Sequence, residues 1–134
     1  MITAHKTSIR QLRVILVAAE NIASGKAARF KGKAEIVLMR ARAGRVDLKS
    51  LFRFLAGRGV VRLLVEGGGE VIENVLSKGL AQEIYMIVAP KVIGGRLAPS
   101  SVGGKGVDRL EDAIPVRSLE AGKIGADVLL HGLL

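Results

Sequence analysis

The chain has 134 residues, of which 49% are hydrophobic, and these values are typical of a single globular domain. It contains no cysteine, which excludes a disulfide framework and a thiolate nucleophile, and its two histidines lie at opposite ends, so we expect no metal site. The net charge of +9 fits a solvated basic surface or a site for phosphorylated small molecules better than nucleic-acid binding, because the basic residues are scattered and only 3% of residues are aromatic.

The first half of the chain contains two strand patterns and one helix pattern. Residues 12–17 and 35–39 are short apolar runs rich in β-branched residues, as in buried strands, and residues 20–33 connect them. A basic loop follows. Asp47 then occupies the position of a helix N-cap, because apolar residues follow it at helical spacing until Gly57.

The next elements surround a run of three glycines. Residues 62–65 predict a third strand, which ends at the glycines. The apolar residues after the glycines recur with the period of a helix, and Lys78 followed by Gly79 is a typical helix end. Residues 83–89 predict a fourth strand.

The last third of the chain contains a long loop and a hairpin pattern. The glycine-rich segment of residues 90–106 is longer than a passive connection, so we interpret it as a binding loop. Residues 115–119 and 126–133 predict two antiparallel strands with a turn in the sequence EAGKIG.

Strands that alternate with helices predict an α/β fold. We expect a mixed, mainly parallel sheet flanked by helices, closed by the C-terminal β-hairpin, in one domain over residues 1–134. No apolar run approaches the roughly 20 residues of a membrane span, and the polar start of the chain lacks the pattern of a secretory signal. We therefore predict a cytoplasmic protein. Scarce Asn and Gln, together with abundant charge, favour a thermophilic source.

The sequence LLVEGGGEVIENVL at residues 63–76 is the main candidate for a binding site. A strand, a glycine turn and a helix place backbone N–H groups and the positive end of the helix dipole together, which favours a bound phosphate or pyrophosphate at Gly67, Gly68, Gly69 and Glu70. The spacing matches neither the dinucleotide fingerprint nor a Walker loop. A tight turn without a ligand therefore stays open as the alternative.

Glu66 directly precedes these glycines. A carboxylate at the end of a buried strand is unfavourable unless it is paired or binds a ligand. We interpret it as an acceptor of hydrogen bonds from ligand hydroxyl or amino groups. The alternative is a salt bridge to Arg62 or Lys91.

Residues 58–95, with the paired motifs Glu-Gly-Gly and Ala-Pro-x-x-x-Gly-Gly, resemble the reductases of riboflavin biosynthesis. Residues 46–134 match the family pattern well, and residues 1–45 match it weakly. The resemblance implies a dihydrofolate-reductase-like fold and the activity of an NADP-dependent oxidoreductase. The short form of this family is found in archaea, among others. It implies reduction of the ribosylamino group of a pyrimidinone 5′-phosphate to a ribitylamino group.

The resemblance also implies roles for individual residues. Glu66 lies at the substrate, and Gly67, Gly68, Gly69 and Glu70 hold the phosphates of NADPH, with NADH as the alternative cofactor. The loop that contains Pro90, Gly94 and Gly95 lies near the active site. The substrate is a phosphorylated pyrimidine, the expected assembly is a homodimer, and no catalytic residue is assigned.

The chain departs from the family at its start. Family members carry a longer first portion, with a motif beside the nicotinamide and a segment for the 2′-phosphate of the cofactor. Val17 and Ala18 stand where the family often has Asp-Ser, which weakens one cofactor contact. We therefore expect the C-terminal part of a reductase. The alternative is a truncated, non-catalytic nucleotide-binding or dimerisation domain derived from that family.

Overall fold

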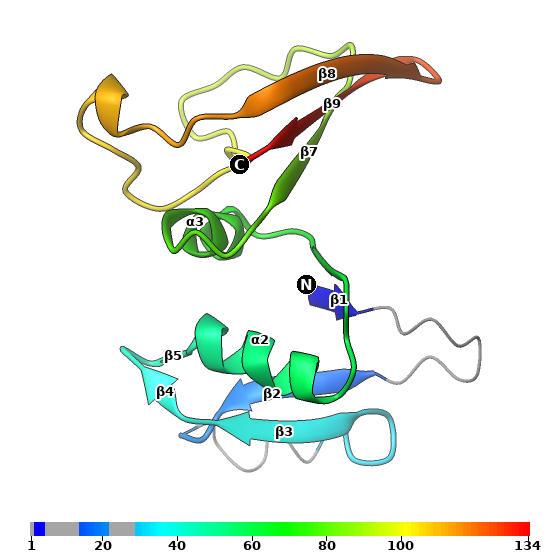
Figure 1. The fold of residues 1–134 in the computed structure, drawn as a ribbon, viewed down its shortest axis with the longest axis vertical. Helices are drawn as coiled ribbons and strands as arrows, with labels where there is room; N and C mark the ends of the chain where they lie inside the picture. The colour runs from blue at the N-terminus through cyan, green and yellow to red at the C-terminus, as the bar shows by residue number, and fades with distance from the viewer. Residues whose placement is uncertain (1, 5–13, 22–28) are drawn as a thin grey trace. The chain divides into compact units, whose positions relative to one another are not determined.

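The computed structural model describes residues 2–4, 14–21 and 29–134, and these form two compact units (Figure 1). One unit comprises residues 2–64 and the other residues 65–134. The single domain over residues 1–134 stays a prediction.

The first unit is built on a parallel pair of strands, β2 (Ile15–Ala19) and β3 (Glu35–Met39), which pair in register from Ile15 with Glu35 to Ala19 with Met39. The predicted strand at residues 35–39 is confirmed with the same bounds. The strand predicted at residues 12–17 is found at Ile15–Ala19, and residues 12–13 lie outside the described part. Residues 22–28 of the predicted connection also lie outside it.

Two short strands replace part of the expected basic loop. They are β4 (Ala41–Arg42) and β5 (Arg45–Val46), which pair as an antiparallel hairpin. Ala43 and Gly44 connect them, both with a positive φ, of 48° and 73°. The left-handed backbone at two successive residues is what a two-residue hairpin turn requires.

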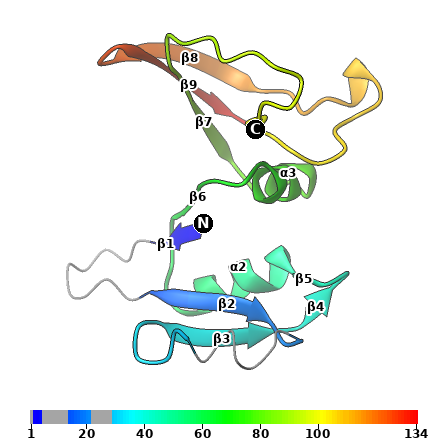
Figure 2. The same cartoon turned by 180° about the vertical axis from the view of Figure 1, so that it is seen from behind.

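Helix α2 (Leu48–Gly57) begins where the sequence predicts. The side chain of Asp47 accepts a hydrogen bond from the amide of Ser50 at 3.0 Å, which satisfies one of the unpaired N–H groups of the first turn. Leu51 and Leu55 lie one helical turn apart and are buried, as is Ala18 of β2. Figures 1 and 2 show α2 running beside the β2–β3 pair, so these apolar side chains form the core of the unit.

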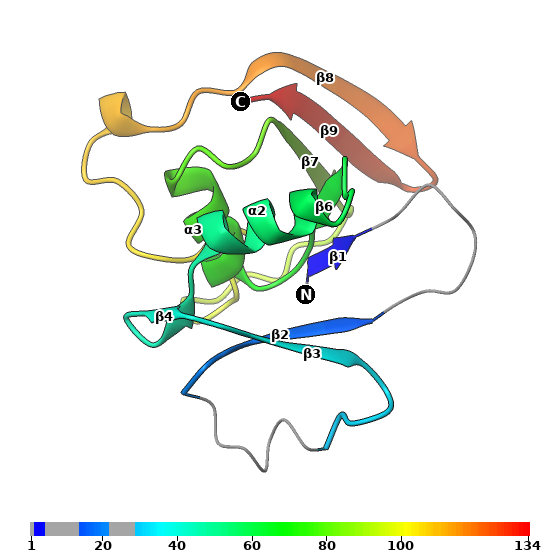
Figure 3. The ribbon, with the colours of Figure 1, turned by 60° about the horizontal axis from the view of Figure 1, so that its bottom comes forward.

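Strand β6 (Leu63–Val65) pairs with β1 (Ile2–Ala4) and leads into the second unit. The elements of that unit are α3 (Gly69–Ser77), β7 (Glu83–Val88), the short 3₁₀ helix η1 (Leu110–Asp112), β8 (Arg117–Ile124) and β9 (Asp127–Leu133). The last three strands form an antiparallel sheet in the order β7-β9-β8, and Figure 3 shows β8 and β9 side by side as a long curved ribbon.

The C-terminal hairpin is confirmed, but the predicted position of its turn is wrong. The sequence EAGKIG was expected to form the turn, and five of its six residues lie in β8 instead. The turn is at Gly125 and Ala126, where Gly125 has a φ of 62°. Gly122 is extended within β8. The strand therefore continues to the glycine whose backbone adopts the left-handed conformation.

The sheet carries a polar cluster across β7 and β9. The rings of Tyr85 and His131 stack with their centroids 4.4 Å apart, and the two residues pair directly across the strands. The hydroxyl of Tyr85 donates a hydrogen bond to the Glu83 carboxylate at 2.7 Å, and His131 Nε2 lies 3.4 Å from the same oxygen. The ring stack joins β7 to β9, whereas the hydrogen bond from Tyr85 to Glu83 lies within β7.

Candidate functional site

The glycine turn lies between β6 and α3, as predicted. Gly67 and Gly68 have φ values of 70° and 69°, a conformation that other residues adopt only at a cost. Gly68 is the N-cap of α3, and its carbonyl accepts hydrogen bonds from the amides of Val71 and Ile72. The two glycines are exposed at the positive end of the helix dipole, so an anion can approach their backbone closely.

Glu66 is exposed at the end of β6. The expectation of a carboxylate at the end of a buried strand is therefore wrong, because β6 is itself only partly buried and its Leu64 is 48% exposed. The desolvation argument for a ligand at Glu66 no longer holds. A role for this carboxylate at the substrate depends on its position beside the glycine turn alone, and it stays a prediction.

A segment of the long loop reaches the first turn of α3. The amide of Gly103 donates to the carbonyl of Gly69 at 3.0 Å, and the amide of Gly104 donates to Glu70 Oε1 at 3.3 Å. Figures 1 and 2 show this part of the loop, in yellow, passing the end of α3. Sequence reasoning interpreted the loop as a binding loop but gave no indication of this contact.

The part of the loop before this contact, residues 90–102, is exposed to solvent. Pro90, Gly94 and Gly95 are exposed, and Gly94 and Gly95 adopt positive φ values of 65° and 91°. The side chain of Lys105 pairs with Asp108 at 3.1 Å, which balances its charge locally. The structure thus connects residues 103–104 with the glycine turn, whereas the position of Pro90 near an active site stays a prediction.

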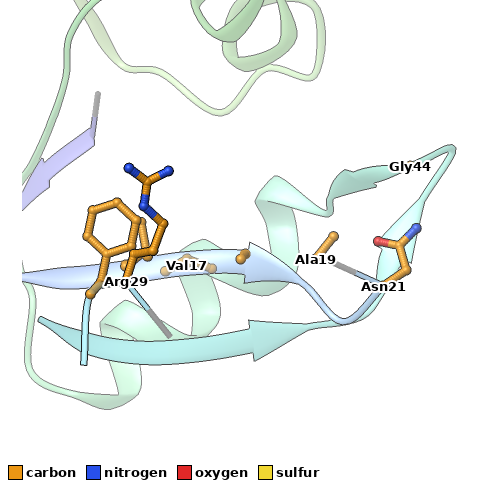
Figure 4. Close-up of a pocket in the computed structure, with 8 residues that line it drawn as sticks. Val17, Ala19, Asn21, Arg29 and Gly44 are labelled. Carbon is orange, nitrogen blue, oxygen red and sulfur yellow. The ribbon is translucent and has the colours of Figure 1, made fainter. Parts of the chain in front are cut away.

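The first unit contains a separate cavity of about 530 Å³ near the carboxyl end of β2 (Figure 4). Val17 and Ala19 line it from the strand, and Asn21, Arg29 and Gly44 line it from the segments that follow. Ligands of α/β proteins bind at the carboxyl ends of parallel strands, so this position is itself a signal of a binding site. Sequence reasoning noted Val17 and Ala18 but did not find Asn21 or Arg29.

Residues 2–4, 14–21 and 29–134 contain no group of three or more His, Cys, Asp or Glu side chains arranged to hold a metal ion. Within the same residues, no helix has the length and apolar character needed to cross a membrane.

Two known archaeal proteins with similar sequences carry the same function name. The chain is 33% identical over 117 residues to the 2,5-diamino-6-ribosylamino-4(3H)-pyrimidinone 5′-phosphate reductase of Methanothermobacter thermautotrophicus, which covers 87% of this chain and 53% of the relative. It is also 44% identical over 61 residues to the reductase of the same name from Archaeoglobus fulgidus. That alignment covers 46% of this chain and 28% of the relative. The chain therefore spans about half, or less, of these relatives.

Solved structures agree on the fold. RibD of Acinetobacter baumannii superposes with a TM-score of 0.64 at 16% identity, over 89% of this chain and 36% of that chain. This likeness confirms the predicted α/β, dihydrofolate-reductase-like fold. The family model described as RibD C-terminal domain matches residues 5–130, which is nearly the whole sequence. The chain therefore belongs to the RibD C-terminal domain family.

Proposed function

We propose that this chain is the reductase part of a riboflavin-biosynthesis enzyme. The reaction is the NADPH-dependent reduction of the ribosylamino group of a pyrimidinone 5′-phosphate to a ribitylamino group. Family membership and the names of the relatives support the reaction class. The observation that carries the proposal is the turn of Gly67 and Gly68, which presents an exposed backbone at the N-terminus of α3.

The glycine turn fits the diphosphate of a pyridine nucleotide. A Cβ atom at Gly68 would meet Val71 Cγ2 at 3.8 Å, which is an ordinary contact, so the space over the turn is open. In the proposal, the backbone of Gly67, Gly68, Gly69 and Glu70 holds the phosphates. NADPH, or NADH as the alternative, supplies the hydride when it is bound.

The chain's own contribution to the reaction is positioning. Glu66 directly precedes the phosphate-binding turn, where its carboxylate accepts hydrogen bonds from the hydroxyl or amino groups of the substrate and orients the sugar carbon. Hydride transfer depends on orientation and polarisation more than on a strong nucleophile, which suits a chain without cysteine. We assign no residue to proton transfer.

A non-catalytic nucleotide-binding or dimerisation domain is the second candidate. The observation that favours it is the pair Val17 and Ala18, which stands where the family often has Asp-Ser and weakens one cofactor contact. Both candidates share the cofactor turn and differ in turnover. A homodimer, a phosphorylated pyrimidine as substrate and a cytoplasmic location belong to the proposal as well.

Two measurements test the proposal. Saturating NADPH should raise the melting temperature, since a ligand at 100 times its Kd stabilises the folded state by about 2.7 kcal/mol. Parallel melts with NADH give the cofactor preference. If NADPH leaves the melting temperature unchanged, this chain does not bind the cofactor by itself. Consumption of NADPH with the pyrimidinone phosphate then separates the candidates, because the non-catalytic domain predicts no turnover.

A further inference from the structure

Residues 100–104 form a short segment, here called the strap, that is bound to the first turn of α3. The amide of Gly103 donates to the carbonyl of Gly69 at 3.0 Å, and the amide of Gly104 donates to Glu70 Oε1 at 3.3 Å. Within the strap, the hydroxyl of Ser100 donates to the carbonyl of Val102 at 2.7 Å. One backbone bond and one side-chain bond thus connect the strap to the turn that is proposed to bind phosphate.

The contact requires glycine on both sides. A Cβ atom at Gly69 would lie 2.8 Å from the Gly103 nitrogen and 3.2 Å from the Ser100 oxygen. A Cβ atom at Gly103 would lie 2.9 Å from the nitrogen of Glu70. Because these neighbours are backbone atoms, they cannot move aside as a side chain would. The two backbones therefore fit together in one specific arrangement.

The charges near the strap are unfavourable for an anion. The carboxylate of Glu70 faces Gly104, and a Cβ atom at Gly104 would lie 3.0 Å from Glu73 Oε2. Lys105 pairs with Asp108 at 3.1 Å. A phosphate that approached from the strap side would meet two carboxylates, whereas Gly67 and Gly68 are exposed. The open route to the helix N-terminus is therefore over these two glycines.

We propose that the side chain of Glu70 is a positioning residue that holds the strap and does not contact phosphate. By accepting the Gly104 N–H, it keeps Gly103 on the Gly69 carbonyl and fixes the first turn of α3 in the conformation that binds the cofactor. This inference rests on the proposed function. It assigns the side chain of Glu70 a role in pre-organisation, separate from the exposed backbone of Gly67 and Gly68, over which the anion approaches.

Amide hydrogen exchange of the ligand-free protein tests the strap. Glu70→Ala removes the acceptor and should accelerate exchange in peptides that cover residues 100–104. Glu70→Gln keeps an acceptor oxygen and should retain the wild-type exchange rate. Glu120→Ala, at an exposed position of β8, is the control for the loss of one negative charge. Equal exchange in the wild type and Glu70→Ala would overturn the inference.

NADPH titrations test the role in binding. Glu70→Ala should weaken NADPH binding about tenfold, which corresponds to about 1.4 kcal/mol. Glu70→Gln should bind at least as tightly as the wild type, because it keeps the strap and removes a negative charge. If Glu70→Ala melts at a lower temperature but keeps the wild-type Kd, Glu70 is merely structural and the inference fails. If the wild type itself does not bind NADPH, the proposed function fails too, while the exchange measurement still decides whether Glu70 holds the strap.

Discussion

Gly69 and Gly103 lie 34 residues apart in the sequence, and their backbones are in direct contact. The amide of Gly103 donates to the carbonyl of Gly69 at 3.0 Å, in a space that admits no Cβ atom on either residue. Gly103→Ala should therefore lower the free energy of unfolding by about 1–3 kcal/mol, as overpacking does.

Gly122→Ala is the matched control for this variant in denaturant titrations. Like Gly103, Gly122 has no positive φ, but a Cβ atom at this position would meet nothing within 4 Å. Its replacement should change stability by no more than about 0.5 kcal/mol. Equal losses in the two variants would contradict the close contact between Gly69 and Gly103.

The N-cap of α2 gives a second prediction about stability. Asp47 accepts hydrogen bonds from both the amide and the hydroxyl of Ser50, at 3.0 Å and 2.7 Å. Asp47→Ala should cost about 1 kcal/mol in denaturant titrations, because an N–H group of the first turn loses its partner. Asp47→Asn retains an acceptor and should stay near the wild type. A similar loss in both variants would mean that the negative charge, and not the cap, matters.

Arg58 and Glu35 form an ion pair with an N–O distance of 2.6 Å, and the guanidinium lies 4.4 Å from the centre of the Phe54 ring. The hydrogen bond to Glu35 raises the pKa of Arg58 above its ordinary value. Because the pKa of Arg58 is higher in the folded than in the unfolded state, the ion pair stabilises the fold fully at any pH below the pKa of the unfolded state. This stabilisation is lost only when the pH rises through the pKa of the folded state. The contribution of Arg58 should therefore stay constant through the neutral pH range.

A double-mutant cycle with Arg58→Ala and Glu35→Gln tests this pair by melting temperature. Both side chains are more than a third exposed, so the coupling should shrink as salt is added. Additive effects of the two changes at low salt would show that the pair contributes nothing. A coupling that changed between about pH 6 and pH 9 would contradict the assigned cause.

Local signals account for the elements that were predicted well. The run at residues 35–39 and the cap at Asp47 depend on neighbours in the sequence, and the structure confirms both. The turn of the C-terminal hairpin was predicted wrongly, because Gly122 and Gly125 have the same backbone freedom and the sequence does not distinguish them. Only the pairing of β8 with β9 determines which of the two glycines forms the turn.

Non-local features could not be predicted in this way. The strap contact depends on the path of a long loop between β7 and η1, which no periodicity in the sequence specifies. The exposure of Glu66 depends on what covers the end of β6, and the apolar pattern of LLV does not contain that information. The glycine turn itself was predicted, because a strand, glycines and a helix follow one another directly.

The proposed cofactor turn gives a fourth prediction. Gly68→Ala should weaken NADPH binding, because its φ of 69° disfavours alanine and a Cβ atom enters the space over the turn. Gly59→Ala is the control, since Gly59 has a φ of 79° and a Cβ atom there would meet nothing within 4 Å. Both variants should lose about 1 kcal/mol of stability from backbone strain. Only Gly68→Ala should raise the Kd for NADPH, and an equal rise in both would argue against phosphate binding at this turn.

Glu66 provides the sharpest test of catalysis, because it is exposed and directly precedes the cofactor turn. If its carboxylate binds the substrate, Glu66→Gln should lower kcat/KM about 10- to 100-fold, the range expected for one hydrogen bond to a charged group. The free energy of unfolding should change by no more than about 1 kcal/mol, as for other exposed charges. Kinetics with the pyrimidinone phosphate and a denaturant titration of the same variant give both values. A variant with full activity would remove Glu66 from the substrate site, whereas a large loss of stability would assign it a structural role.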